Sequence, residues 1–425
     1  MKNRFFWSTI PKIYEMVLGL TIGIAIINYL GPEDQGKIGF IINLISIMSF
    51  LFTLGIGPIY SRFISVVNNK KLVLERTHLN LGLRLIGFFI FFFSIEAIIL
   101  STKENLLLLS LPLVIGKLFT SLDLYSNIAE GSGNFKKYAF SKIISLTLVT
   151  LFRIYCLYFE KNIYWIVASF FIQDFLLFLI YFLMYDRFSV LGFTFCKKKS
   201  LIILTQNYKL ALSSIVVGLF TQMDVVMISL LLDNISAGEF YASTRLSTPL
   251  NFIAVLLIST YFNELSKKWK HNKNSFFELI SFISGIMFYI YLSILIFIYF
   301  FGEEIFFLFF NNEYTNSLNL FYIHISGLFF LFLGPISGKY LIIKKDYSSE
   351  LSKTLIAAIV NILFNVISLL FFKSIFLVAI SSVISYFIAN YAYFIYKKDY
   401  QFIKSINQGF NIKLLIKNYE KFKKL

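Results

Sequence analysis

The sequence predicts an all-α membrane protein that crosses the bilayer about twelve times, with its helices in two six-helix lobes. Of its 425 residues, 58% are hydrophobic and only 15% are charged, and the mean hydropathy is +0.75. The apolar residues form continuous runs of roughly 20 or more, long enough to cross the hydrocarbon core as helices. Their hydropathy does not alternate as in a strand of an outer-membrane barrel, so helices are expected.

The expected spans are separated by short polar or basic segments. They are residues 7–29, 38–64, 78–100, 106–129, 140–159, 163–185, 207–232, 240–263, 277–301, 318–343, 354–372 and 375–396. The turn at residues 29–36 contains two glycines, a proline and two acids, which end one helix and begin the next. A similar turn at residues 232–241, where Gly238 matches Gly36, indicates that the chain is duplicated.

Basic residues set the expected orientation. The chain carries 39 Lys and Arg against 23 Asp and Glu, a formal net charge of +16. They form short clusters between the apolar runs rather than one basic soluble face, so no nucleic-acid partner is expected. Most of them fall on alternate loops, in one class with both termini. The positive-inside rule therefore predicts that both termini are cytoplasmic.

A long basic loop at residues 186–206 divides the chain near its midpoint. We expect a first lobe at 1–190, a cytoplasmic linker at 191–206, a second lobe at 207–397 and a basic cytoplasmic tail at 398–425. Six helices return the chain to the same side, so the lobes would be parallel repeats. A second internal sequence similarity, besides the two turns, supports this prediction, because Tyr138-Ala-Phe-Ser-Lys142 resembles Ser349-Glu-Leu-Ser-Lys353.

The tail mixes apolar residues with lysines. Ile403, Ile406 and Phe410 fit an amphipathic helix that lies on anionic lipid. A solvated basic tail after the last span is the alternative, and the sequence leaves both open.

Ionisable residues inside the expected spans are the candidates for function, because each costs a few kcal/mol or more at membrane depth. Lys117 is expected near mid-span, as a cationic contact in a cavity or as a partner of Asp174 or Asp123. Arg84 and Arg153 lie within about two helical turns of a span end and are further cationic candidates.

Two residues of the second half join this set. Arg245 lies near a span end, where it could recognise phosphate with its guanidinium fork or anchor the helix at the interface. Asp224 lies near mid-span and could neutralise an arginine or bind a coupling proton or cation. Asp174 is the second candidate for such charge balance.

Glycines and prolines within or between the spans are candidate bends and packing points that let a bundle rock. They are Gly31, Gly36, Pro58, Pro249 and Pro335. The alternative is the ordinary tolerance of glycine and proline in membrane helices.

Signatures of enzymes and metal sites are missing from the sequence. It has no phosphate-binding Gly-Lys-Ser/Thr loop, its three histidines are scattered, and its two cysteines are expected at different depths. No segment between the expected spans is long enough for a soluble catalytic domain. We therefore expect no catalytic residue, no metal and no cofactor.

Four short motifs resemble one family of membrane proteins. They are Tyr29-Leu-Gly-Pro-Glu-Asp-Gln-Gly36; Asp224 followed by Gly238-Glu-Phe-Tyr241-Ala-Ser-Thr-Arg245-Leu246; Gly338-Lys-Tyr340-Leu341; and Asn361-Ile-Leu-Phe-Asn365. Together they resemble bacterial polysaccharide exporters of the Wzx type, the O-antigen and capsule unit flippases of the multidrug/oligosaccharidyl-lipid/polysaccharide (MOP) exporter superfamily.

The resemblance implies two six-helix lobes around a central cavity that opens alternately to each side of the bacterial inner membrane. It implies an undecaprenyl-diphosphate-linked oligosaccharide as substrate, H⁺ or Na⁺ as coupling ion, and an O-antigen polymerase and chain-length regulator as partners. Arg245 and Asp224 carry over because they lie in matching motifs, whereas Lys117, Arg84 and Arg153 rest on their expected depth alone.

Two other functions stay open at this point. An O-antigen polymerase or ligase would be an enzyme of similar length, but it should carry a large outer loop, and the outer loops expected here are short. A multidrug/cation antiporter of the same fold would differ in having more buried acids than buried bases.

Overall fold

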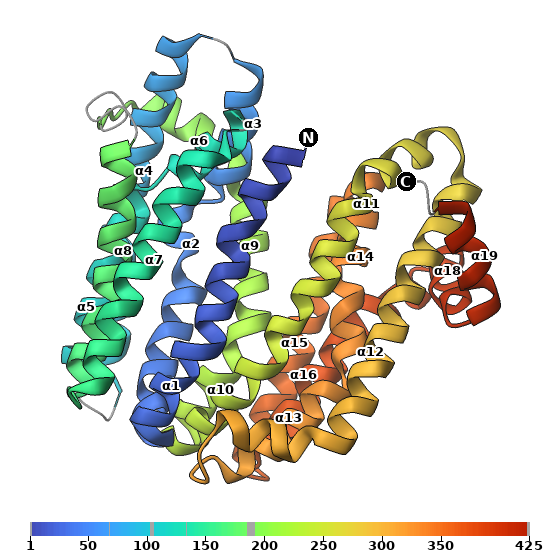
Figure 1. Ribbon diagram of the computed structural model, residues 1–425. Coiled ribbons are helices and arrows are strands. Elements are labelled where there is room, and N and C mark those ends of the chain that lie inside the picture. Colours follow the sequence, from blue (N-terminus) through green and yellow to red (C-terminus); the bar gives the residue numbers. More distant parts are fainter. Residues whose placement is uncertain (1, 68, 103–105, 133, 185–191, 423–425) are drawn as a thin grey trace. The chain divides into compact units, whose positions relative to one another are not determined.

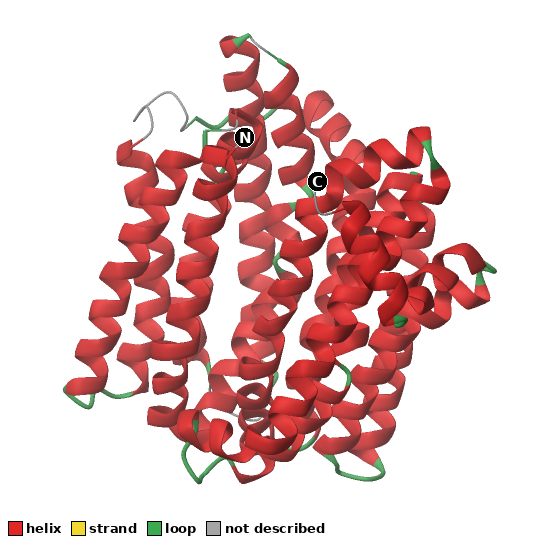
Figure 2. Ribbon diagram, turned by 45° about the vertical axis from the view of Figure 1, so that its right-hand side comes forward, coloured by secondary structure: helices red, strands yellow, loops and turns green. Residues whose placement is uncertain are grey.

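A computed structural model describes residues 2–67, 69–102, 106–132, 134–184 and 192–422. In these ranges every regular element is a helix, and no strand occurs (Figure 2). The chain divides into two compact units, Met1–Leu230 (unit 1) and Leu231–Leu425 (unit 2). This division groups residues 207–230 with unit 1, whereas the sequence assigns them to the second lobe. The lobe boundaries stay a prediction.

Within its described residues, unit 1 contains nine helices. Figure 1 labels them in chain order. In the described part of the chain they are α1 (Lys2–Met48), α2 (Phe50–Thr53), α3 (Ile56–Val66), α4 (Lys70–Leu100), α5 (Leu107–Leu122), α6 (Tyr125–Ser132), α7 (Phe135–Tyr158), α8 (Ile163–Met184) and α9 (Lys197–Leu231).

Unit 2 contains the remaining elements. In the described part of the chain they are α10 (Asn234–Ser247), the 3₁₀ turn η1 (Thr248–Leu250), α11 (Asn251–His271), α12 (Lys273–Phe309), α13 (Thr315–Ser326), α14 (Leu328–Lys344), α15 (Tyr347–Leu370), α16 (Ile375–Phe387), the π-helical turn η2 (Ile388–Ala392), α17 (Tyr393–Tyr396), α18 (Tyr400–Gly409) and α19 (Ile412–Phe422).

Among the described residues, nine helices are long and apolar enough to cross a membrane, or ten if the bent pair α13–α14 forms one span. One of the nine, Thr9–Thr53, includes Gly31, whose φ of 72° breaks α1 where the sequence predicts a turn. α1 would be about 70 Å long as one rod, more than twice the hydrocarbon thickness, so it is long enough for the two spans that the sequence predicts there. α9 adds a shorter apolar helix, Thr221–Leu231. The count of twelve stays a prediction.

The core of unit 1 is apolar and closely packed. α5 packs on α8, α8 on α7, and α7 on α1. Buried residues of α1, α4 and α5, such as Ile41, Phe91 and Val114, form one cluster that includes Val226 of α9. Gly87 lets α4 approach the short helix α2, because a Cβ there would lie 2.0 Å from the Leu51 carbonyl oxygen. This packing holds α5, α7 and α8 at fixed positions.

In unit 2 the C-terminal tail folds back onto the bundle. α18 and α19 both pack on α12, and the rings of Tyr340 and Phe402 stack at 4.5 Å between centroids. Gly409 lies so close to α12 that a Cβ would meet the Ser284 hydroxyl at 2.6 Å. The amphipathic helix expected in the tail is present as α18, but protein covers its apolar face, where Ile403 and Ile406 are buried.

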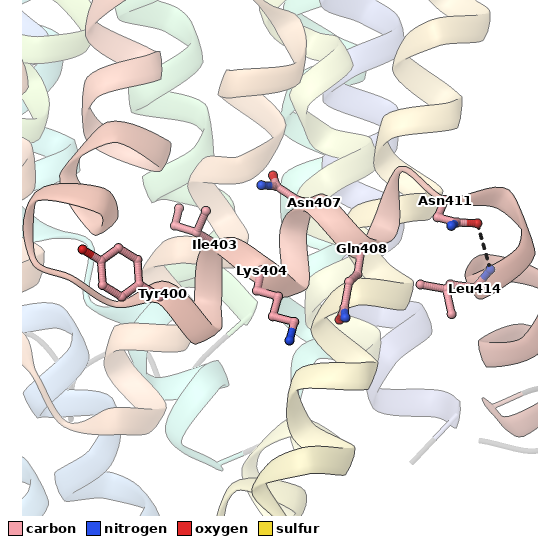
Figure 3. Close-up of a pocket in the computed structure, with 7 residues that line it drawn as sticks. All are labelled: Tyr400, Ile403, Lys404, Asn407, Gln408, Asn411 and Leu414. Atoms are coloured by element: carbon pink, nitrogen blue, oxygen red, sulfur yellow. Dashed lines mark hydrogen bonds between the residues drawn. The ribbon is translucent and has the colours of Figure 1, made fainter.

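The exposed part of the tail mixes polar and apolar side chains, such as Lys404, Asn407, Tyr400 and Ile412. Figure 3 shows a hollow lined by Tyr400, Ile403, Lys404, Asn407, Gln408, Asn411 and Leu414. Asn411 caps α19, because its side-chain oxygen accepts hydrogen bonds from the backbone N–H groups of Lys413 and Leu414.

Candidate functional site

The best-defined charged site in a membrane-spanning segment of unit 1 joins α5 and α8. The Lys117 ammonium donates a hydrogen bond to Asp174 Oδ2 at 2.6 Å, which is one of the pairings expected from the sequence. The side chain of Lys117 stays 27% exposed and that of Asp174 14%. An ammonium has three donors and this bond uses one, so Lys117 can still bind a second acceptor.

Gly116 makes this pair possible. A Cβ at this position would lie 3.1 Å from Asp174 Oδ2 and 3.3 Å from the Phe171 Cα. Any larger residue would therefore push the Asp174 carboxylate or the α8 backbone away by a few tenths of an ångström. Gly116 is not among the residues predicted from the sequence, although a glycine directly before an intramembrane lysine is a usable signal.

Arg153 on α7 adds a second cation to the same group of helices. Its Nε donates to Ser169 Oγ and its Nη2 to Gln173 Oε1, both at 3.0 Å. The guanidinium lies 4.7 Å from the centroid of Phe170 and within electrostatic range of Asp174. We call Lys117, Arg153 and Asp174 the Lys117 cluster; it holds two positive groups against one negative group.

Arg84 is bound differently. Its Nη1 and Nη2 donate to the carbonyl oxygens of Asp123 and Thr120, both at 2.9 Å, and the residue is buried. These carbonyls end α5, where unpaired backbone acceptors and the helix dipole favour a cation. Arg84 thus stabilises the end of α5, and we leave it out of the proposed binding set.

Asp224 and Arg245 lie in different environments. Asp224 is buried on α9, next to residues of the apolar core of unit 1. Arg245 is exposed in the last turn of α10, with its guanidinium 4.3 Å above the ring of Tyr241. The 3₁₀ turn η1, with Pro249 at its start, follows at once and separates α10 from α11. The roles of both residues stay predictions.

The other candidate hinge residues occupy three kinds of position. Gly31 breaks α1, whereas Gly36 is buried within its second half. Pro58 lies in the first turn of α3, where helix N–H groups have no intrahelical partner anyway. Pro335 lies inside α14, where the nearby Phe330 carbonyl accepts a hydrogen bond from Asn390. Movement at these points stays a prediction.

Unit 2 contains a buried lysine, Lys353, that is not among the residues predicted from the sequence. Lys353 lies one residue before the expected span 354–372, but in the structure it is inside α15 and 4% exposed. Its ammonium donates to Ser337 Oγ at 2.7 Å and lies 3.2 Å from Glu350 Oε2. Ser337 in turn donates to Asn390 of η2 at 3.0 Å. The repeated Ser-Lys motif at Lys142 and Lys353 was the available signal.

Comparison with known sequences identifies the family. A family model described as polysaccharide biosynthesis protein matches residues 1–262, more than half of the chain. The chain belongs to this polysaccharide biosynthesis family. No curated protein sequence matches closely enough to add a nearer relative.

Solved structures share the fold of this family member. An inward-facing multidrug resistance MATE family transporter of the MOP superfamily matches with a TM-score of 0.72 and 15% identity, covering 95% of this chain and 99% of that one. The lipid II flippase MurJ in an inward closed conformation matches with a TM-score of 0.64 and 16% identity, covering 98% of this chain and 93% of that one. A MOP superfamily transporter from Pyrococcus furiosus matches with a TM-score of 0.63 and 15% identity, covering 96% of each chain. The chain therefore has the MOP transporter fold.

Proposed function

We propose that this protein is a flippase that moves an undecaprenyl-diphosphate-linked oligosaccharide, an O-antigen or capsule repeat unit, across the bacterial inner membrane by alternating access. The family match and the MOP fold support the transport of a lipid-linked saccharide. The Lys117 cluster is the observation that carries the choice of an anionic substrate, because its cations exceed its acids.

The chemistry of the substrate fits such a cluster. A diphosphate carries several acceptor oxygens, and charge-assisted hydrogen bonds to ammonium and guanidinium groups are stronger than neutral ones. In the proposal Lys117 and Arg153 of unit 1 contact the diphosphate, while Asp174 and Asp224 balance charge or bind the coupling ion, H⁺ or Na⁺. Arg245 of unit 2 is proposed separately as a phosphate contact, from its motif alone. A polymerase and a chain-length regulator would act on the exported unit.

A multidrug/cation antiporter is the second candidate, and one observation favours it. Among the described residues in the most buried class, the acids Glu96, Asp224 and Glu239 outnumber the bases Arg84 and Lys353. Two of these acids are already bound by protein donors, Glu96 by Ser110 and Glu239 by Asn316. The count therefore overstates the number of acids that are available to a cationic drug.

Deletion of the gene separates the candidates. A flippase mutant should accumulate single lipid-linked units on the cytoplasmic leaflet, whereas a mutant lacking the polymerase, the enzymatic alternative, should still export one unit. Normal surface polysaccharide together with increased drug sensitivity would instead identify the antiporter. Complementation with Lys117→Ala should fail, and Lys267→Ala, at a surface pair with Glu264, is the matched control.

A further inference from the structure

A second cationic site lies in unit 1, away from the Lys117 cluster. It is a hollow of about 220 Å³ between α3, the first turns of α4, and α9. Its lining combines cations with apolar side chains. The residues are Phe63, Leu72, Glu75, Arg76, Leu79, Lys199 and Ile202.

Arg76 supplies the free positive charge of this hollow. Its guanidinium lies 5.8 Å from the ring centroid of Phe63, and its Nε has no acceptor in the part of the chain that the structure describes. Glu75, the acid of the hollow, lies 3.8 Å from the Lys199 ammonium instead. The hollow therefore keeps one excess positive charge, carried by a side chain with no carboxylate partner among the described residues.

The polar face continues along α4. Asn80 follows Arg76 by four residues, so both lie on one side of the helix, and Arg84 continues the row one turn further. Asn80 is 0% exposed, yet neither its amide nitrogen nor its oxygen has a hydrogen-bond partner among the described residues. Buried amides are normally paired with protein or water, so a bound water is expected beside Asn80, which is not among the residues that line the hollow.

The rim of the hollow is apolar. Leu72 is 49% exposed and Ile202 46%, and both lie beside the cations. A ligand that satisfies both features has an anionic head and a hydrocarbon tail. We propose that this hollow binds the phosphate group of a membrane lipid, with Arg76 as its main contact.

The position in the chain suits such a ligand. Lys70 and Lys71 begin α4 and are exposed at the end that the positive-inside rule predicts to be cytoplasmic. Basic pockets between membrane helices at this level favour anionic headgroups. The proposal does not depend on the transported substrate, since a phospholipid or a polyprenyl diphosphate offers the same phosphate chemistry.

Lipid binding to the purified full chain tests this site. Native mass spectrometry would measure binding of phosphatidylglycerol, phosphatidylcholine, undecaprenyl diphosphate and inorganic diphosphate to the wild type and variants. Arg76→Ala should weaken phosphatidylglycerol binding by roughly tenfold, and Arg76→Lys should weaken it less. Lys71→Ala, which removes an exposed charge five residues away, is the matched control and should retain most of the binding. Glu75→Gln should strengthen binding.

Each outcome decides the proposal. Arg76-dependent binding of phosphatidylglycerol or undecaprenyl diphosphate supports it. The lipid that binds more strongly identifies which phosphate the hollow binds. Equal binding of phosphatidylcholine, equal losses in Arg76→Ala and Lys71→Ala, or binding of inorganic diphosphate without either lipid would overturn it. If Arg76→Ala fails to fold, Arg76→Lys and Glu75→Gln still give opposite shifts. Flippase activity is measured separately, so this site can fail while the proposed function holds.

Discussion

Lys117 of unit 1 and Lys353 of unit 2 are both ion-paired within a membrane-spanning helix, but they differ in their partners and in their burial. Lys117 reaches from α5 to a carboxylate on α8 and stays 27% exposed. Lys353 pairs with Glu350 on its own helix, donates to Ser337 on α14, and has a side chain only 5% exposed. The donors of Lys117 can serve a ligand, whereas those of Lys353 are used to hold helices together. Both lysines are ion-paired, so their different burial is what makes Lys117, and not Lys353, the lysine proposed to bind substrate.

The largest effect on stability is expected at Lys353. Lys353→Ala should lower the free energy of unfolding by about 3 kcal/mol, the low end of the range for breaking a buried ion pair, because Lys353 is buried but Glu350, which loses its counter-charge, is 31% exposed. Thermal unfolding in detergent would measure this loss. Lys353→Met combined with Glu350→Gln should recover part of it, since no unpaired charge is left. A stability equal to wild type in Lys353→Ala would remove the distinction between the two lysines.

Lys117→Ala should affect stability less than Lys353→Ala and transport more. The loss of one partly exposed charged hydrogen bond is expected to cost about 1.5–3 kcal/mol of stability, less than at Lys353. Transport should be lost, because the cluster then contains one cation and one acid. The readout is surface polysaccharide in a complemented deletion strain, normalised to the amount of protein in the membrane. Full display with Lys117→Ala would exclude the Lys117 cluster from substrate binding.

Gly116→Ala tests whether the close approach of α5 and α8 matters. The added Cβ would contact Asp174 and the backbone at Phe171, which should cost about 1–3 kcal/mol in a well-packed interior. Gly19→Ala is the control, since a Cβ there meets nothing within 4 Å. Equal unfolding temperatures for the two variants would show that the pair does not require a glycine.

The smallest effect is expected outside the spans, at the start of α15. Asp346 accepts hydrogen bonds from the Ser349 N–H and the hydroxyls of Ser348 and Ser349. Burial alone would raise the pKa of Asp346, but the Ser349 and Ser348 bonds outweigh it and lower this pKa. Its contribution is therefore present above the unfolded pKa of about 3.9 and is lost as pH falls through the lower folded value. Asp346→Ala should cost about 0.5–2 kcal/mol near neutral pH and less in acid, measured by thermal unfolding.

Hydropathy and turn residues were enough to predict the helical class and the break at Gly31, because both depend on local composition. The pairing of Lys117 with Asp174 could be named as an alternative from depth alone. The hydrogen-bond partners of Arg84 could not be predicted, because they are backbone carbonyls of another helix. Every residue has such a carbonyl, so it gives no signal in the sequence. Lys353 was misplaced because the polar first turns of α15 lower the local hydropathy, although they continue the same helix.

The π-helical turn η2 has a consequence for the attachment of the tail. Such a turn contains one residue more than an α-helical turn, so everything after Ala392 is rotated by about 100° around the helix axis. In this rotated frame Phe394 lies 4.4 Å from Phe402, ring centroid to centroid. Removing one residue from η2 would turn Phe394 away from α18 without changing any side chain in that contact. The number of residues in a single turn thus sets whether Phe394 adds its ring to the contacts that α12 and Tyr340 already make with the C-terminal helices.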